Sequence, residues 1–324
     1  MLILGLQGSP RKGGNTDTLL AAFLDRAAQA GAAVKTIQVA RAGIVPCKGC
    51  GYCETHGVCV IADDPMSKEI YGLLREADLV VAATPVFFYG ISAQLKGLID
   101  RTQTLWSRKY VYRLKDPLAA TRKGVLFSVA ASQGRQLFDG IHLTTKYFFD
   151  AIDADFTHAL TYRGLEAKGA VRKQAGLAAD IEAAVEKTVR PLLNRKRVLF
   201  LSSHGACRAP MAAAMAQLRY GQRIRAAFGA PSPASELSAP MVQAMARVGV
   251  DMAFRKPMNL QDAMHGLTPD LIVGMGTGVD TRGFGQVEFV PWPLAEPAAS
   301  DDATMDRLRL TIEMHLDGLM QGVV

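Results

Sequence analysis

The sequence predicts two α/β domains, the first of them built on a doubly wound parallel sheet. Short apolar runs alternate with longer segments of helical composition, and a glycine-rich loop follows the first apolar run. The same alternation begins again after the basic stretch 195–197. With 324 residues, of which 49% are hydrophobic, the chain can fill two cores. We therefore expect domains at residues 1–195 and 196–324.

The first domain is expected to alternate strictly between strands and helices. Strands are predicted where short apolar runs occur, at 2–7, 34–39, 78–83 and 124–130. Helices are predicted where apolar residues recur at helical spacing, at 18–30, 66–76, 93–105 and 141–152. A charged, alanine-rich segment predicts one long helix over 171–193, which ends the domain.

The second domain restarts with a strand at 198–201, a loop at 202–208 and a helix at 210–219. Pro210 suits the first turn of that helix, where its missing N–H group would be unpaired anyway. Further strands are predicted at 270–275 and 287–290, and a closing helix at 302–320. The second domain is thus a smaller α/β unit.

Composition sets the broad class and the expected surroundings of the chain. The formal net charge is +7, but the basic residues are scattered, so we expect solvated surface and no nucleic-acid partner. The excess positive charge favours encounters with an acidic partner such as an electron-carrier protein. No apolar run is long enough to span a bilayer, and the amino terminus lacks the features of a secretion signal. We expect a cytoplasmic protein without a membrane partner.

The cysteines form the most specific pattern in the chain. Four of the five fall within one short segment, as Cys47, Cys50, Cys53 and Cys59. Three thiols at two-residue intervals, with glycines between them and a fourth thiol following, suit an iron–sulfur cluster. Structural zinc is the second interpretation, although its ligands usually come as two separated pairs. Free thiols or disulfides without a metal are the third.

The loop after the first predicted strand has the composition of an anion-binding site. Ser9, Asn15 and Thr16 offer polar donors, glycines allow the backbone N–H groups to approach a ligand, and the next helix presents its positive end. The motifs of dinucleotide folds and of nucleotide P-loops are absent. Taken alone, the segment is also compatible with a plain strand-to-helix connection.

A second loop, after the strand predicted at 78–83, is apolar and aromatic. It contains Pro85, Val86, Phe87, Phe88, Tyr89 and Gly90. Ligands of doubly wound sheets bind at the carboxyl ends of the strands, so this loop is placed to contact a flat ring. When the loop is considered alone, ordinary packing is the better explanation of residues 86–89. The two loops together favour a ligand site.

Five blocks of the first half together resemble the flavodoxin-fold NADPH-dependent FMN reductases, and within that group the iron–sulfur flavoproteins. The blocks are Gly8-Ser9-Pro10-Arg11 with Asn15-Thr16, the cysteine segment, Asp63-Asp64-Pro65, Thr84-Pro85-Val86-Phe87, and 95–101. The resemblance implies FMN with its phosphate on Ser9, Arg11, Asn15 and Thr16 and its ring against 85–90. It also implies a four-iron four-sulfur cluster on the four cysteines, and a homo-oligomer.

These cofactors predict an FMN-dependent oxidoreductase. A cluster passes single electrons whereas a flavin holds one or two, so electrons are expected to enter from a ferredoxin-like carrier and leave to a small acceptor. Direct reduction of FMN or of a quinone by NAD(P)H, without a cluster, is the alternative. A redox sensor that reports to an oxyanion-binding module is a third hypothesis.

The second half, over about 197–320, resembles the low-molecular-weight protein tyrosine phosphatases and the related arsenate reductases. The resemblance rests on the strand, the loop ending in Cys207-Arg208, and the segment Trp292-Pro293-Leu294-Ala295-Glu296. Ser202 stands where the family has its nucleophilic cysteine, and Glu296 stands where an aspartate is expected. A serine without a base is a poor nucleophile. We expect oxyanion binding through Arg208 without turnover, and Cys207 as buried packing.

Overall fold

The computed structural model describes residues 1–276 and 285–323 and resolves the chain into two compact units. The first unit comprises Met1–Arg113 and Thr121–Asn194, and the second comprises Leu114–Ala120 and Arg195–Val324. The segment 114–120, which the expected boundary assigns to the first domain, therefore belongs to the second unit. There the backbone of Lys115 bonds Gly249 and Asp251, and Asp116 forms a buried ion pair with Arg255 at 2.8 Å.

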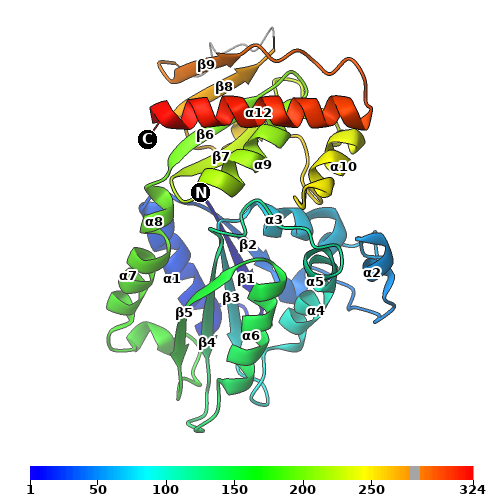
Figure 1. Ribbon diagram of the computed structural model, residues 1–324. Helices are drawn as coiled ribbons and strands as arrows, with labels where there is room; N and C mark the ends of the chain where they lie inside the picture. The colour runs from blue at the N-terminus through cyan, green and yellow to red at the C-terminus, as the bar shows by residue number, and fades with distance from the viewer. Residues whose placement is uncertain (277–284, 324) are drawn as a thin grey trace. The chain divides into compact units, whose positions relative to one another are not determined.

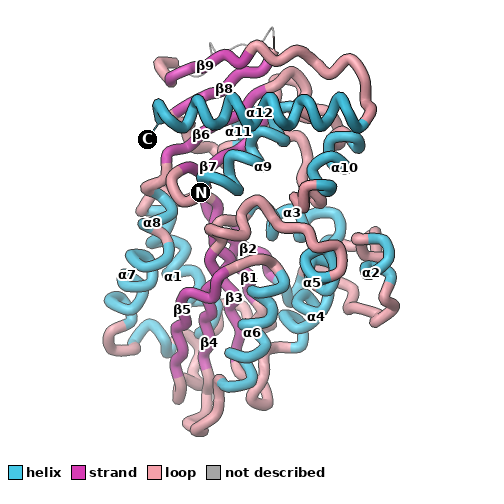
Figure 2. The backbone as a smooth tube through the Cα atoms, in the orientation of Figure 1, coloured by secondary structure: helices cyan, strands magenta, loops and turns pink. Residues whose placement is uncertain are grey.

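The first unit is built on a five-stranded parallel sheet of order β2-β1-β3-β4-β5 (Figures 1 and 2). Its strands are β1 Leu2–Gln7, β2 Ala33–Gln38, β3 Leu79–Pro85, β4 Lys123–Val129 and β5 Asp155–Tyr162. This is the strand order of flavodoxin-like folds, in which ligands bind at the carboxyl ends of the strands. The predicted flavodoxin-like α/β fold is confirmed.

Helices cover both faces of this sheet. The helices are α1 Asn15–Gln29, α2 Tyr52–His56, α3 Tyr71–Glu76, α4 Ala93–Arg101, α5 Gln103–Tyr110, α6 Asp139–Ala151, α7 Leu177–Thr188 and α8 Arg190–Leu193. Short turns of helix lie at Val39–Arg41, Met66–Ile70 and Ala170–Lys173. Helices α1 and α7 share one hydrophobic core with β1, β3 and β4, and α4, α5 and α6 lie on the opposite side (Figure 1).

The helix expected over 171–193 is not continuous. It is divided into the turn Ala170–Lys173, α7 and α8. Gly176 precedes α7 with a φ of +84°, a left-handed conformation that glycine adopts without strain and that a helix interior cannot contain. Pro191 lies in the first turn of the short α8, where its missing N–H group is tolerated. The alanine-rich composition concealed both interruptions.

The second unit has a four-stranded parallel sheet of order β7-β6-β8-β9. Its strands are β6 Lys196–Leu201, β7 Ile224–Gly229, β8 Leu271–Met275 and β9 Glu288–Trp292. Its helices are α9 Arg208–Tyr220, α10 Ala239–Arg247, α11 Leu260–Ala263 and α12 Asp302–Val323. Parallel strands joined by helices confirm the predicted second α/β domain.

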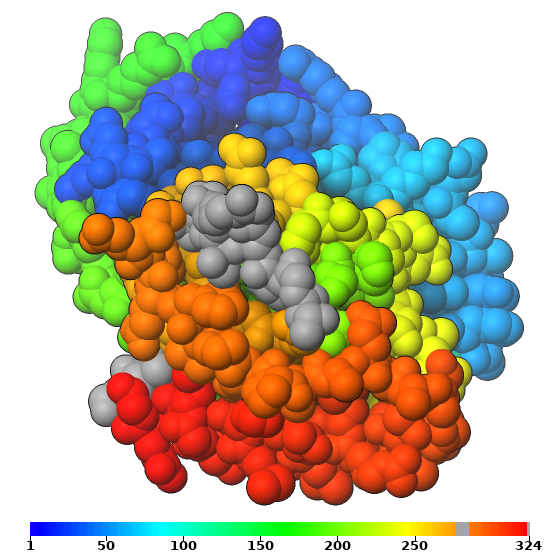
Figure 3. Space-filling view, turned by 90° about the horizontal axis from the view of Figure 1, so that it is seen from above, coloured from blue at the N-terminus to red at the C-terminus, as the bar shows by residue number. Residues whose placement is uncertain are grey.

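The core of the second unit lies mainly between the sheet and helices α9, α10 and α12, and a smaller apolar cluster with α11 covers the other face (Figure 2). The outer side of α12 faces solvent, as the red surface in Figure 3 shows, and it carries the exposed Leu310 and Met314. Among the described residues, no helix is both long and apolar enough to cross a membrane.

Candidate functional site

Four loops meet at the carboxyl edge of the first sheet. The loop 8–14 follows β1 tightly, because the N–H group of Gly8 donates to Ala83 O at 2.8 Å. A Cβ atom at Gly8 would lie 2.8 Å from the Cβ atom of Leu95, so a side chain does not fit there. The loops after β4 and β5 are joined by a hydrogen bond from Gly164 N to Ser132 O at 3.1 Å. These contacts hold the loops together at the edge of the sheet where the sequence predicts a ligand site.

The loop 8–14 leads into the amino end of α1 without a side-chain cap. The first N–H groups of a helix lack partners within the helix and carry its positive end, which favours an anion. Ser9 and Thr16 are buried beside this end, whereas Arg11 is exposed. The Ser9 hydroxyl accepts from Arg11 N at 3.2 Å, and Thr16 bonds no other described side chain. Both hydroxyls retain a proton to donate.

Asn15 has a role that the sequence did not indicate. Its side-chain amide donates to Leu165 O at 2.8 Å and to Ala167 O at 3.0 Å, and its carbonyl accepts from Val171 N at 3.1 Å. The side chain is therefore engaged with the loop after β5. Asn15 thus ties the loop after β5 to the start of α1, and its own side-chain donors are already used.

The loop after β5 also carries Lys168, whose side chain lies beside the loop 8–14. The Lys168 side chain passes Gly13 so closely that a Cβ atom there would lie 3.1 Å from its Cε and 3.4 Å from its Nζ. Gly13 also has a φ of +63°, which favours glycine. Sequence reasoning missed Lys168, because nothing in the local sequence links it to a loop that lies about 150 residues earlier. An ammonium group here adds positive charge beside the α1 terminus.

The aromatic loop 85–90 ends in a tight turn. Phe87 and Gly90 exchange backbone hydrogen bonds at 2.9 Å, and Phe88 and Tyr89 both have positive φ, 47° and 61°. Two adjacent left-handed residues that are not glycine cost about 1–3 kcal/mol each, which is typical of functional loops. Phe87, Phe88 and Tyr89 are exposed, Phe88 completely. The turn presents aromatic surface to solvent instead of burying it.

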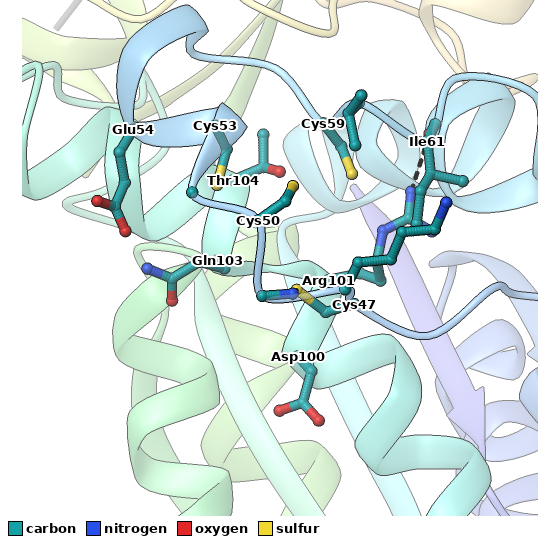
Figure 4. Close-up of a pocket in the computed structure, with 14 residues that line it drawn as sticks. Cys47, Cys50, Cys53, Glu54, Cys59, Ile61, Asp100, Arg101, Gln103 and Thr104 are labelled. Atoms are coloured by element: carbon teal, nitrogen blue, oxygen red, sulfur yellow. Dashed lines mark hydrogen bonds between the residues drawn. The ribbon is translucent and has the colours of Figure 1, made fainter.

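The cysteine segment follows β2 and forms its own pocket. Cys47, Cys50, Cys53 and Cys59 all line a cavity of about 660 Å³, together with the ends of α4 and α5 (Figure 4). Left-handed Gly49, Gly51 and Gly57 turn the backbone around the short α2. All four thiols are free, with Cys47 and Cys50 exposed. The segment brings its four thiols to one open cavity.

Hydrogen bonds to sulfur already exist in this pocket. Gly49 N donates to Cys47 Sγ at 3.4 Å, and the Ser107 hydroxyl of α5 donates to Cys53 Sγ at 3.6 Å. Bonds of this kind tune the sulfur ligands of metal clusters. Within residues 1–276 and 285–323, no three His, Cys, Asp or Glu side chains gather closely enough to hold one metal ion. The ligands of a cluster surround a larger object than a single ion.

The residues present suit both implied cofactors. The loop 8–14 and the start of α1 offer helix-terminal N–H groups and the buried hydroxyls of Ser9 and Thr16, and Lys168 from the loop after β5 lies beside them, which is the donor set that a phosphate group requires. The pocket of the cysteine segment offers four thiols and donors to their sulfur atoms, which is the donor set of an iron–sulfur cluster. The exposed aromatic turn offers a flat apolar surface.

In the second unit, the loop 202–207 between β6 and α9 turns its carbonyl groups outward. Ser203 O, His204 O and Ala206 O accept from the N–H groups of Ser232, Ala234 and Ser238. The N–H groups of residues 203–207 have no hydrogen bond to another described residue, and Gly205 has a φ of +61°. Successive unpaired N–H groups of this kind are the feature from which anion-binding nests are built.

Arg208 and Glu296 meet at this loop. Arg208 is buried, donates to Leu294 O at 2.7 Å and forms an ion pair with Glu296. Ser202, also buried, is the first residue after β6. Burial raises the pKa of the Cys207 thiol to about 11, despite the neighbouring Arg208. Cys207 packs against the core and its Sγ lies 4.0 Å from Met305 Sδ, so the thiolate is disfavoured at neutral pH.

Comparison with known proteins relates the first unit to one family. Residues 1–146 match the family described as NADPH-dependent FMN reductase. The chain is 39% identical over 120 residues to an iron–sulfur flavoprotein of Methanosarcina thermophila, covering 37% of this chain and 61% of that protein. It is 41% identical over 105 residues to an iron–sulfur flavoprotein of Methanocaldococcus jannaschii, covering 32% and 53%. The chain thus matches just over half the length of these relatives.

A solved structure of an arsenate reductase from Archaeoglobus fulgidus is also similar to this chain. The identity is 21%, the TM-score is 0.31, and the similarity covers 38% of this chain and 97% of the reductase. The family match lies within the flavodoxin-like part of the chain, which carries the anion-binding loop, the aromatic turn and the cysteine pocket.

Proposed function

We propose that the protein is an FMN-dependent oxidoreductase that carries a four-iron four-sulfur cluster on Cys47, Cys50, Cys53 and Cys59. The observation that supports this most directly is the single pocket lined by all four thiols, in a unit that matches FMN reductases. When bound, the cluster exchanges single electrons and FMN holds one or two, so together they link one-electron donors to two-electron acceptors.

The proposed FMN site uses the loops at the carboxyl edge of the first sheet. The N–H groups at the start of α1, with Ser9, Arg11 and Thr16, bind the phosphate, and Lys168 supplies a further charge. Asn15 fixes the loop that carries Lys168. The aromatic turn at 85–90 contacts the flavin ring and excludes water from one side of it.

The proposed donor is a ferredoxin-like carrier and the proposed acceptor a small molecule, with the protein acting as a homo-oligomer. An open pocket on exposed cysteines suits electron entry from another protein, and the net charge of +7 favours an acidic carrier. Direct reduction of FMN by NAD(P)H is the competing route, favoured by the description of the matching family.

One experiment tests this proposal. The full chain is purified anaerobically, and iron, acid-labile sulfide and FMN are quantified per chain. We expect about four iron, about four sulfide and about one FMN. Zinc in place of iron, or FMN alone, would reject the cluster. Rapid bleaching of the flavin by NADPH under anaerobic conditions, with no response to reduced ferredoxin, would replace the proposed donor by NAD(P)H.

We further propose that the second unit binds a tetrahedral oxyanion without hydrolysing an ester. The inward N–H groups of residues 203–207 and the buried Arg208 support binding. Ser202 in the nucleophile position and the unfavourable thiolate of Cys207 argue against turnover. Calorimetric titration with phosphate and a p-nitrophenyl phosphate assay test the two parts separately: we expect binding without hydrolysis, and measurable hydrolysis would reject the inactive assignment.

A further inference from the structure

The cysteine segment is closed at its base by one buried side chain. Arg101, the last residue of α4, has no exposed side-chain surface. Its Nη1 donates to Val45 O at 2.7 Å, and its Nη2 donates to Ile61 O at 3.1 Å. Val45 lies two residues before Cys47 and Ile61 two residues after Cys59. One guanidinium group therefore joins the chain entering the segment to the chain leaving it; Figure 4 shows its bond to Ile61.

Asp64 fixes that guanidinium group in place. Its carboxylate accepts from Arg101 Nη1 at 2.6 Å and from Nη2 at 3.2 Å, and it also accepts from Val45 N at 3.1 Å. Ser67 completes the network, since its hydroxyl accepts from Arg101 Nη2 at 3.1 Å and donates to Ile61 O at 2.5 Å. A paired, planar guanidinium group is well suited to such a multiple contact, and an ammonium group is not.

Between the two clamped points, the segment is supported by α5, where Arg108 Nη1 donates to Gly57 O at 3.0 Å and the Ser107 hydroxyl donates to Cys53 Sγ at 3.6 Å. It contains left-handed glycines and the five-residue α2, and two of its cysteines are exposed. A short helix of this kind is not stable alone, so the positions of the outer thiols depend on what holds the ends of the segment. Arg101 also lines the thiol pocket, and its buried Nε–H group has no partner among the described residues.

We propose that Arg101 is the positioning residue that allows this chain to retain its cluster. Its guanidinium group closes the base of the cysteine segment and so holds the outer thiols, Cys47 and Cys59, at the spacing of a single cluster. Its unused Nε–H group is available to a sulfur atom of the bound cluster. This inference rests on the proposed function, because it requires that the cysteines hold a cluster.

The test compares Arg101→Gln and Arg101→Lys with a matched control, Arg122→Lys. Arg122 is another fully buried arginine of the same unit that donates to three backbone carbonyl groups, those of Ala77, Ile152 and Arg75, away from the cysteines. Iron, sulfide and FMN per chain and the melting temperature are measured for each variant. We expect both Arg101 variants to lose iron by about tenfold or more, as when outer partners of metal ligands are removed, while FMN remains bound.

Three results would overturn the proposal that Arg101 acts as a clamp, that is, that it closes the base of the cysteine segment. The first is wild-type iron content in Arg101→Gln, the second is full rescue by Arg101→Lys, and the third is equal iron loss in Arg122→Lys. Should the Arg101 variants fail to fold, Ser67→Ala removes the hydroxyl that bonds both Arg101 Nη2 and Ile61 O and leaves their direct bond weakened by the loss of this support, and we expect a faster loss of iron to a chelator than in wild type. An unchanged rate in Ser67→Ala would also count against the clamp.

A second readout separates this inference from the proposed function. If wild type binds no iron, the cluster proposal fails, but the clamp is still measurable in the metal-free chain. There, Arg101→Gln should increase the alkylation rates of Cys47 and Cys59 relative to wild type and Arg122→Lys, because the segment opens. Equal rates in all three proteins would show that Arg101 does not position the thiols.

Discussion

The guanidinium group of Arg208 forms an ion pair with the carboxylate of Glu296 at the mouth of the oxyanion loop of the second unit. Arg208 is buried, whereas the Glu296 side chain is 64% exposed and therefore able to move away. Gly276 makes room for this arrangement, because a Cβ atom there would lie 2.6 Å from Arg208 Nη1. The carboxylate of Glu296 therefore already pairs with the guanidinium charge that a bound oxyanion would need.

Removing this carboxylate should strengthen anion binding. In Glu296→Gln, phosphate no longer competes with a negative charge for Arg208, and we expect its affinity to rise by about tenfold, or about 1.4 kcal/mol. Isothermal titration of the full chain with phosphate measures the change. Glu313→Gln is the control, since it removes another ion pair of the second unit, with Arg309, far from the loop in sequence. Weaker binding in Glu296→Gln would show that Glu296 supports the anion site.

Cys207 should behave as a half-buried, protonated thiol and not as a nucleophile. Because burial raises its pKa to about 11, its alkylation rate should rise about tenfold per pH unit between pH 8 and pH 10, following the thiolate fraction. Mass spectrometry after timed alkylation measures this profile, with the urea-unfolded chain as the reference for a free thiol. A plateau near pH 7 would identify an activated thiolate, as would aryl-phosphate hydrolysis that Cys207→Ser abolishes.

Local patterns predicted the fold class and the groups that are close in sequence. The cysteine spacing and the loop 8–14 are short segments, so their residues were found without a structure. The strands β5 and β7 were missed, because β5 is a partly exposed edge strand with polar residues and β7 contains alanines that suit a helix equally well. Edge strands bury less apolar surface and give a weaker pattern.

Groups assembled from distant segments were not predictable. Lys168 lies beside Gly13 in a loop after β5 that Asn15 holds. Arg101 binds backbone carbonyl groups, and every residue has one, so no sequence pattern indicates these partners. The sequence marked Asn15 as a phosphate donor, while the structure shows its side chain bonded to the loop 165–171. An amide side chain suits both roles, and only tertiary contacts distinguish them.

Asn15 should therefore contribute to stability as well as to FMN binding. Asn15→Asp keeps the size of the side chain but removes both donors, so Leu165 O loses its side-chain partner, Ala167 O keeps only the bond from Ala170 N, and both carbonyls face a carboxylate. We expect a loss of about 1–3 kcal/mol in the free energy of unfolding, even in the FMN-free protein. Urea unfolding monitored by circular dichroism measures it. Thr16→Val is the control, because Thr16 bonds no other described side chain. For Thr16→Val we expect weaker FMN binding without such destabilisation. A destabilised Thr16→Val together with an Asn15→Asp of unchanged stability would reject this division of roles.

Lys168 should strengthen FMN binding through charge. For Lys168→Gln we expect an affinity about tenfold lower and less sensitive to salt, since one exposed cation beside the phosphate is lost. Fluorescence titration of FMN into the metal-free chain at two salt concentrations measures both effects. Lys173→Gln changes a neighbouring exposed lysine after the same strand and should have little effect. Equal losses in the two variants would indicate only a general effect of surface charge.

The ionisation of Asp64 should make the stability of the fold depend on pH. Burial opposes its ionisation, but hydrogen bonds from Arg101, Ser67 and Val45 hold the pKa of this carboxyl group below its ordinary value of 3.8. A depressed pKa in the folded state means that the ionised group stabilises the fold fully above 3.8 and loses this contribution as the pH falls through the lower, folded-state value. Asp64→Asn should therefore be less stable than wild type at pH 6, with the difference shrinking below about pH 4. Urea unfolding of both proteins from pH 6 to pH 3 measures this.

Asp63→Asn is the matched control for Asp64→Asn, because Asp63 is its exposed neighbour and pairs only with the exposed Lys68 among the described ion pairs. A stability difference for Asp64→Asn that stays constant down to pH 3 would mean that the ionised carboxylate is not what holds Arg101.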